Sequence, residues 1–284
     1  MAQLLKGLAV ANALTEELAE RVAALQAQNI TPTLAILRVG ERPDDISYET
    51  GAVKRCEKVK IAVRKFILAS DCTKDELLNA VLEINNDPSI HGCLMFRPLP
   101  DKAMEEAACA LLSPEKDIDG MTSGSLATVF TGKGAGYPPC TAQACIELLD
   151  HYNIPLQGKR VTVIGRSLVI GKPVSMMLQA KNATVTMCHT KTVDMDKICQ
   201  DAEILVIAAG KAGVVDGRFV SPGQIVVDVG INVNEEGKLC GDAKFDEAEP
   251  IVEAITPVPG GVGSVTTAVL AKHVIEAAEK TVGQ

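Results

Sequence analysis

The chain has 284 residues, of which 47% are hydrophobic and 23% charged, and it carries a formal net charge of −8. This length favours two domains, because single hydrophobic cores stop growing near ~250–300 residues. The negative charge and the scattered Lys and Arg residues argue against a nucleic-acid partner. No apolar run approaches the ~20 residues that span a bilayer. The first twenty residues carry acidic side chains and lack a small-residue cleavage site, so we expect no signal peptide.

The nine cysteines are odd in number and include no C-x-x-C pair. This pattern favours neither a disulfide framework nor a metal site. We therefore expect most of them to be small buried side chains of a protein in a reducing cytoplasm. Cys140, in a Pro-Pro-Cys-Thr turn, is a candidate nucleophile, although a buried structural role is the favoured interpretation.

Strands and helices alternate through the first 112 residues. The strand expected at 33–39 is a nearly continuous apolar run, typical of a strand covered on both faces. Thr73 and Glu76 have the spacing of a capping box. The other expected strands are 63–68 and 91–96, and the expected helices are 2–28, 44–59, 73–86 and 102–112. This alternation predicts a parallel sheet with right-handed crossovers.

The second half repeats the alternation. Residues 123–139 are rich in Gly, Ser and Thr and are predicted to form an interdomain loop. The expected helices are 141–152, 173–181, 193–200 and 266–280, and the expected strands are 161–164, 184–188, 203–208 and 225–229. We predict an α/β protein with a cleft between two domains. Residues 1–140 and the C-terminal helix 266–284 would form an α/β substrate domain, and residues 141–265 a Rossmann-type, doubly wound dinucleotide-binding domain.

A glycine turn follows the strand expected at 161–164. Gly165 and Gly171 bracket Ser167, which stands where the G-x-G-x-x-G pattern has its middle glycine. Such a turn brings backbone N–H groups to a phosphate at a helix N-terminus, where the helix dipole favours an anion. Taken alone, the turn fits a nucleotide loop and an ordinary strand-to-helix turn equally well.

The next strand ends in His189-Thr190-Lys191-Thr192, with no acidic residue to bind a ribose 2′-hydroxyl. Arg166, within the glycine turn, adds a guanidinium suited to phosphate. The pattern favours NADP over NAD. The alternative is that Arg166 and Lys191 are solvated surface charges.

Several motifs together carry a family resemblance. In chain order they are Tyr48, RPLP at 97–100, KDIDG at 116–120, PPCT at 138–141, GRSLVIGKP at 165–173, CHTKT at 188–192, DVGIN at 228–232, GD at 241–242 and TPVPGGVG at 256–263. In this order and spacing the chain resembles the methylenetetrahydrofolate dehydrogenase/methenyltetrahydrofolate cyclohydrolase family over nearly its whole length. The resemblance implies a cytoplasmic homodimer of one-carbon metabolism with two α/β domains. It also implies hydride transfer from 5,10-methylenetetrahydrofolate to NADP, or to NAD in some members, and then opening of the methenyl product by water.

The resemblance also implies site residues. Tyr48 would stack on the folate, and Asp119 would contact the pterin; the alternatives are a helix-surface aromatic and a helix-capping carboxylate. Asp117 and Lys116 are interpreted as a structural residue and a surface residue. The implied cofactor-binding residues are Gly165, Arg166, Ser167, Gly171, Thr190 and Ile231, and the implied further substrate-binding residues are Pro259, Gly260 and Gly261.

The chain departs from the family at two positions. The family has a lysine four residues after the tyrosine and a glutamine two residues before the PLP segment, where this chain has Ala52 and Phe96. The chain also has Ser264 and Val265 where the family usually has proline and methionine.

Three nearby cations are poor replacements for the lysine. Lys54 is six residues after Tyr48, which turns it ~240° around the helix. Arg55 shares the face of Tyr48 but stands ~10 Å further along the axis and cannot act as a neutral base. Arg97 is a candidate replacement charge, although its strand parity differs from that of Phe96.

The two family reactions differ in what they need. Hydride transfer needs substrate and cofactor to be positioned, and no side chain must gain or lose a proton. Hydrolysis needs an activated water and a protonated nitrogen, hence an acid/base group. We therefore predict a dehydrogenase with weak or absent cyclohydrolase activity. The alternatives are an inactive folate- or nucleotide-binding paralogue and a dehydrogenase of another small substrate.

Overall fold

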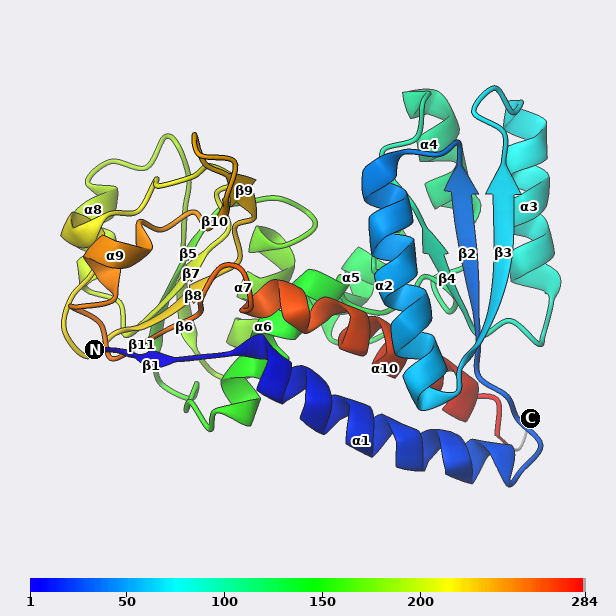
Figure 1. The fold of residues 1–284 in the computed structure, drawn as a ribbon, viewed down its shortest axis with the longest axis horizontal. Helices are drawn as coiled ribbons and strands as arrows, with labels where there is room; N and C mark the ends of the chain where they lie inside the picture. Colours follow the sequence, from blue (N-terminus) through cyan, green and yellow to red (C-terminus); the bar gives the residue numbers. More distant parts are fainter. Residues whose placement is uncertain (283–284) are drawn as a thin grey trace. The chain divides into compact units, whose positions relative to one another are not determined.

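The computed structural model describes residues 1–282, and its chain forms two compact units (Figure 1). The six-stranded unit comprises Met1–Asn12 and Thr141–Thr266, and the three-stranded unit comprises Ala13–Cys140 and the chain from Thr267 onward. The first twelve residues therefore lie with the nucleotide-type sheet, whereas the sequence prediction places them in the substrate domain. The reason is strand β1 (Gln3–Leu4), which pairs in parallel with β11 (Ala254–Ile255).

The three-stranded unit is built on a parallel sheet in the order β3-β2-β4. Its strands are β2 (Thr33–Val39), β3 (Ala62–Leu68) and β4 (Gly92–Met95). All seven residues of β2 are buried, which confirms that both faces of this strand are covered. The unit's helices are α1 (Gly7–Gln26, beginning in the other unit), α2 (Pro43–Val59), α3 (Lys74–Asn86), α4 (Lys102–Leu111), α5 (Ser123–Thr131) and α10 (Thr266–Glu279).

The two faces of β2 pack differently. Ala35, Leu37 and Val39 join one apolar cluster with residues of α3 and α4. Arg38 points the opposite way and forms a buried ion pair with Glu49 of α2, with Nε to Oε2 at 2.9 Å. This ion pair places α2 on the second face, as successive strand side chains alternate.

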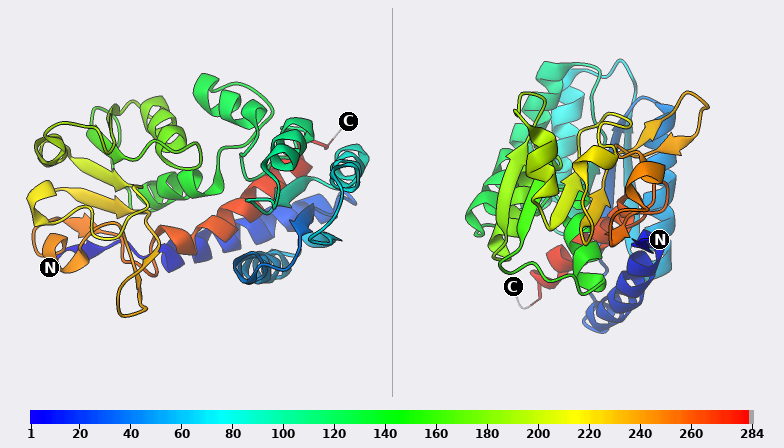
Figure 2. Two further views of the ribbon diagram at one scale, coloured as in Figure 1. Left: turned by 90° about the horizontal axis from the view of Figure 1, so that it is seen from above. Right: turned by 90° about the vertical axis from the view of Figure 1, so that its left-hand side faces the viewer.

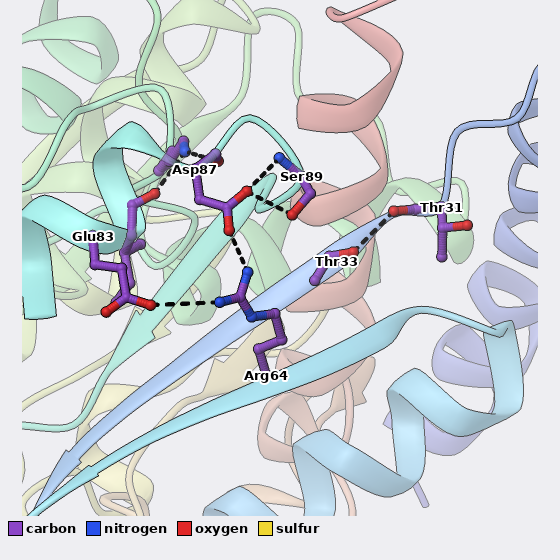
Figure 3. Close-up of polar contacts among 8 residues, drawn as sticks. Thr31, Thr33, Arg64, Glu83, Asp87 and Ser89 are labelled. Carbon is purple, nitrogen blue, oxygen red and sulfur yellow. Dashed lines mark hydrogen bonds and ion pairs between the residues drawn. The ribbon is translucent and has the colours of Figure 1, made fainter.

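A polar network ties β3 to the end of α3 (Figure 3). Arg64 pairs with Asp87, and its Nη2 lies 3.5 Å from Oε1 of Glu83. The Asp87 carboxylate also accepts the backbone N–H of Ser89 at 2.8 Å. The capping box predicted at the start of α3 is confirmed, because Thr73 and Glu76 bond reciprocally.

The interdomain loop predicted at 123–139 is wrong in its first half, where α5 forms. Thr122 caps this helix by accepting the N–H of Ser125 at 3.1 Å, and Gly132 ends it with φ of 69°. A cap at both ends stabilises a helix of small residues. The helix predicted at 2–28 starts at Gly7, since the residues before it include β1.

The six-stranded unit is a parallel sheet in the order β1-β11-β8-β7-β5-β6. The remaining strands of this sheet are β5 (Arg160–Ile164), β6 (Thr184–Cys188), β7 (Ile204–Ile207) and β8 (Ile225–Asp228). Its helices are α6 (Cys140–His151, beginning in the other unit), α7 (Gly171–Ala180), α8 (Met195–Gln200) and α9 (Phe245–Ala248). Strand order reverses at β5, which lies between β6 and β7. Doubly wound sheets bind ligands at such a switch point, outside the carboxyl ends of the strands.

Two features of this unit escaped the sequence analysis. Strands β9 (Asn232–Val233) and β10 (Leu239–Cys240) form an antiparallel hairpin that projects from the sheet (Figure 2). Short 3₁₀ helices form at Gly217–Phe219 and Val262–Ser264. Over residues 1–282, no helix combines the length and the apolar character needed to cross a membrane. The nine cysteines are free thiols, and six of them are buried.

Candidate active site

In the glycine turn after β5, neither Gly165 nor Gly171 has room for a side chain. Gly165 has φ of 129°, and a Cβ built on it would lie 2.2 Å from the carbonyl oxygen of Ala208. A Cβ on Gly171 would lie 2.2 Å from the carbonyl oxygen of Gly165. The backbone therefore folds tightly against itself where α7 begins. Such a cradle lets a pyrophosphate approach backbone N–H groups.

Ser167 supports this turn as an acceptor. Its Oγ accepts the N–H of Ile170 at 3.1 Å and that of Gly171 at 3.5 Å. The hydroxyl thus organises the loop at the position where the common pattern has a glycine. Arg166 is exposed beside it.

The turn lies next to the end of β6. Ile164 pairs with Cys188, and the N–H of Gly165 donates to the carbonyl of Cys188 at 2.9 Å. The exposed Thr190 and Lys191 follow two and three residues later. Because adjacent parallel strands end at the same edge, Arg166 and the 190–191 turn belong to one edge of the sheet.

Asp242 is a buried carboxylate that the sequence analysis did not select. It accepts the three consecutive backbone N–H groups of residues 209–211 at 2.7, 2.8 and 2.9 Å. It also accepts the side-chain amide of Asn232 at 2.9 Å. Asp242 therefore joins the loop after β7 to the loop after β8, at the edge where a cofactor would bind.

Asp228 is a second buried carboxylate in contact with the same loops. It accepts the N–H groups of Gly230, Asp242 and Ala243 at 2.9, 3.1 and 2.8 Å. Burial raises the pKa of Asp228 to about 6, against the effect of these hydrogen bonds. A Cβ on Gly230 would lie 2.3 Å from the Asp242 carboxyl, and one on Gly241 would lie 1.9 Å from that of Asp228. These approaches explain the glycines of the DVGIN and GD motifs.

Ile231 lines a cavity of about 240 Å³ with the loop that carries Pro259, Gly260 and Gly261. The side chain of Ile231 is 66% exposed. Gly7 holds this loop in place, because its N–H donates to the Gly260 carbonyl at 2.9 Å. The structure thus brings four of the sequence-predicted residues into one pocket within the six-stranded unit.

In the three-stranded unit, Tyr48 and Phe96 meet edge to face. Their ring centroids are 6.0 Å apart with planes at 81°. Ala52 follows one helical turn after Tyr48 and is fully buried, and Phe96 is 7% exposed. Apolar atoms therefore occupy both positions where the sequence departs from the family pattern.

The three cations considered as replacements for the family lysine are exposed or bound to other side chains. Lys54 is exposed. Arg55 is partly buried, donates to the hydroxyls of Thr15 and Thr267, and has its pKa lowered by burial. The Nη1 of Arg97 lies 3.9 Å from Glu105 in α4.

Asp119 stands where two predicted motifs meet. A Cβ on Gly120, whose φ is 66°, would lie 2.4 Å from the backbone N of Pro139, so the KDIDG turn packs directly on the PPCT turn. Asp119 is partly buried, and burial raises its pKa to about 6, although its hydrogen bonds with Cys140 lower it. A carboxyl with a perturbed pKa is a candidate functional group.

The neighbours of Asp119 have structural roles. Asp117 is fully buried and accepts the N–H groups of Met121 and Thr122 at 3.1 and 2.7 Å, in agreement with the structural role predicted for it. The interpretation of Lys116 as a surface residue is wrong, since its Nζ donates to the carbonyls of Ile84 and Asp87, both at 2.6 Å. It binds the carbonyl end of α3, where a cation is favourable.

Two family models match the chain. The tetrahydrofolate dehydrogenase/cyclohydrolase catalytic domain matches residues 5–119, and the NAD(P)-binding domain of the same family matches residues 139–282. The chain belongs to the tetrahydrofolate dehydrogenase/cyclohydrolase family. The resemblance inferred from the motifs is thereby confirmed.

Relatives in the tetrahydrofolate dehydrogenase/cyclohydrolase family span the whole chain. Bifunctional protein FolD of Carboxydothermus hydrogenoformans is 50% identical over 281 residues, 98% of each chain. The FolD protein of Clostridioides difficile is 48% identical over 275 residues, 97% of this chain and 96% of its own.

Solved structures of the family have the same fold. The bifunctional FolD enzyme of Campylobacter jejuni superimposes with a TM-score of 0.94 at 36% identity, over 99% of each chain. FolD of Trypanosoma brucei, complexed with NADP cofactor and an inhibitor, gives a TM-score of 0.91 at 33% identity, over 100% of this chain and 99% of its own. The predicted two-domain α/β fold with a Rossmann-like unit is confirmed.

Proposed function

We propose that the chain is an NADP-dependent 5,10-methylenetetrahydrofolate dehydrogenase. The observation that carries this proposal is the pair of domains of one folate-enzyme family, matched over residues 5–119 and 139–282. The glycine cradle at Gly165 and Gly171, which a Cβ would fill, fits a dinucleotide pyrophosphate.

The preference for NADP rests on charge at the ends of β5 and β6. A ribose 2′-phosphate would meet Arg166, with Thr190 as a hydroxyl donor and no carboxylate in the 189–192 turn. When bound, NADP supplies the hydride acceptor. Ser167 shapes the turn that would hold the pyrophosphate, and Ile231 would contact the cofactor from the segment after β8.

Both units contribute residues proposed to contact the substrate. Tyr48 stacks on the folate, and the carboxylate of Asp119 hydrogen-bonds the amino-pyrimidine edge of the pterin. A negative charge there also favours the cationic methenyl product. Pro259, Gly260 and Gly261 present backbone to the substrate. No side chain must transfer a proton in this step, so the apolar pair Ala52 and Phe96 does not impair it.

We also propose that the cyclohydrolase step is weak or absent. Hydrolysis requires a group that activates water and protonates a nitrogen. The position that carries the family lysine is the fully buried Ala52, and Phe96 packs against Tyr48 where the family has glutamine. Arg97 lies beside Glu105, and Arg55 binds two hydroxyls, which leaves neither as a general base.

A spectroscopic assay tests both proposals. Purified protein with 5,10-methylenetetrahydrofolate should form the methenyl product and reduced cofactor, faster with NADP than with NAD. Failure to reduce either cofactor would refute the dehydrogenase assignment. It would favour an inactive binding paralogue or a dehydrogenase of another small substrate. Decay of added methenyltetrahydrofolate should stay near the uncatalysed rate, whereas fast enzymatic decay would show that another group replaces the lysine.

The family resemblance further supports a cytoplasmic homodimer without nucleic-acid or membrane partners. Light scattering coupled to size-exclusion chromatography should give twice the chain mass of 30.0 kDa. A mass of one chain across the micromolar range would contradict the dimer.

A further inference from the structure

We propose that His273 of α10 is a positioning residue for the folate site, which it serves by fixing the backbone that carries Asp119. The inference rests on the proposed role of Asp119 in binding the pterin. His273 itself touches neither substrate nor cofactor in this proposal.

The contact is a buried hydrogen bond to the residue before Asp119. His273 is 2% exposed, and its Nδ1 lies 2.8 Å from the carbonyl oxygen of Ile118. Because a carbonyl only accepts, Nδ1 carries the proton. The peptide plane that begins at this carbonyl ends at the Cα of Asp119, so the bond restricts the point from which the carboxyl projects.

Cys140 adds a second donor to the same carbonyl. Its Sγ lies 3.3 Å from the Ile118 oxygen and 3.8 Å from the Nδ1 of His273. Burial raises the pKa of the Cys140 thiol well above its usual value, which keeps the thiol protonated as a donor. Side chains from two helices, α6 and α10, thus contact the same backbone oxygen, that of Ile118, the residue before Asp119.

The imidazole is itself held in place. The ring of Tyr137 packs against that of His273, with centroids 5.1 Å apart. The Tyr137 hydroxyl accepts a hydrogen bond from the Nζ of Lys280 at 2.8 Å. Lys280 directly follows the last residue of α10 and comes seven residues after His273, about two helical turns, so both side chains lie on one side of the helix. Lys280, Tyr137 and His273 therefore support the Ile118 carbonyl, and through it the backbone of Asp119.

Two substitutions of nearly equal size separate positioning from packing. The amide nitrogen of His273→Asn can stand where Nδ1 stands, so this variant should bond Ile118 and keep its KM for methylenetetrahydrofolate within about twofold. The amide of His273→Gln reaches the Nε2 position instead and leaves the Ile118 carbonyl unsupported. We expect a KM for the folate at least tenfold higher, with an unchanged KM for NADP, since misplacing a binding group by ~1 Å can cost ~10²-fold.

The wild-type assay comes first, because loss of dehydrogenase activity there would refute the proposed function and not this inference alone. With an active wild type, equal folate KM values in the Asn and Gln variants would overturn the positioning role, whatever their melting temperatures. A second variant guards against misfolding of the Gln protein. Tyr137→Leu keeps bulk but removes the ring and the Lys280 bond, and it should raise the folate KM about threefold. An unchanged folate KM in Tyr137→Leu would also contradict the proposal.

Discussion

Asp119 shows how one residue can set the pH range of the enzyme. Its pKa is raised to about 6 by burial, so its carboxyl becomes protonated well above the usual range of an aspartate. Only the ionised form can accept hydrogen bonds with both oxygens and favour a cationic product.

The first prediction follows from that titration. As pH falls through 6, the charged form is lost, and kcat/KM for methylenetetrahydrofolate should decline about tenfold per pH unit. Asp228 has a pKa of about 6 as well, but it lies in the NAD(P)-binding unit. Kinetics between pH 5 and 8 of the wild type and Asp119→Asn separate the two. The variant should be slow and lose the acid limb; a flat wild-type profile would refute the assignment.

The second prediction concerns the two departures from the family. In Ala52→Lys alone, the new side chain enters a fully buried position, and overpacking of this kind costs ~1–3 kcal/mol. Adding Phe96→Gln removes the ring that packs on Tyr48 and opens space for the lysine. Because a general acid/base contributes ~10²–10⁴-fold, methenyltetrahydrofolate hydrolysis should rise at least tenfold.

A matched control has Ala52→Met with Phe96→Gln, which provides a long side chain without an amine. Hydrolysis should stay at the level of the parent. An equal rise in both double variants would show that space, and not the amine, limits the reaction.

Sequence reasoning at this scale identified residues that the family pattern names, such as Tyr48 and Asp119. It quoted the motifs that contain Asp228 and Asp242 but gave these carboxylates no role, because their partners are backbone N–H groups as many as 33 residues away in the chain. Gly230, two residues after Asp228, and Gly241, directly before Asp242, are the sequence signal that could have revealed a close approach to a side chain, because each glycine lies against the other carboxylate.

At the scale of elements, Asp242 connects two loops at the cofactor edge of the sheet. Its carboxylate satisfies three consecutive N–H groups, and an asparagine can offer only one acceptor oxygen and adds donors. The third prediction is that Asp242→Asn lowers the free energy of unfolding by ~2–3 kcal/mol, as expected for lost hydrogen bonds to a charged group, and raises the KM for NADP.

Urea unfolding and cofactor kinetics check this prediction. Asp246→Asn is the matched control, since Asp246 is exposed four residues away. It should change neither quantity. If Asp242→Asn keeps both wild-type values, the loops are held by other contacts.

The accuracy of the predicted elements depended on their length and burial. The strands at 33–39 and 184–188 agree with the structure residue for residue. The first is a wholly buried apolar run, and the second is rich in β-branched residues, although it lies at the edge of its sheet and only Cys188 is buried. Helix α5 was missed because its Gly, Ser and Thr content suggested a loop, while its stability depends on caps at Thr122 and Gly132. The two-residue strand β1 has no periodicity to detect.

At the scale of the whole molecule, the three-stranded unit is discontinuous in sequence. It needs α10, which buries Val269, Leu270 and Val274 completely and pairs Arg21 with Glu279 at 2.7 Å. The fourth prediction is that residues 1–140 alone show no cooperative unfolding. Joining residues 265–282 through a flexible linker should restore it, measured by circular dichroism in urea. A cooperative transition of the short fragment at the midpoint of the joined one would contradict this view.

The pairing of β1 with β11 also bears on how the protein forms on the ribosome. Gln3 leaves the ribosome about 250 residues before its partner Ala254. At translation rates of ~5–20 residues per second, this segment waits roughly 12–50 s for its neighbour. The His273 contact needs a helix that is made later still. Both substrate recognition and the last edge of the nucleotide sheet are therefore completed only after nearly the entire chain has been translated.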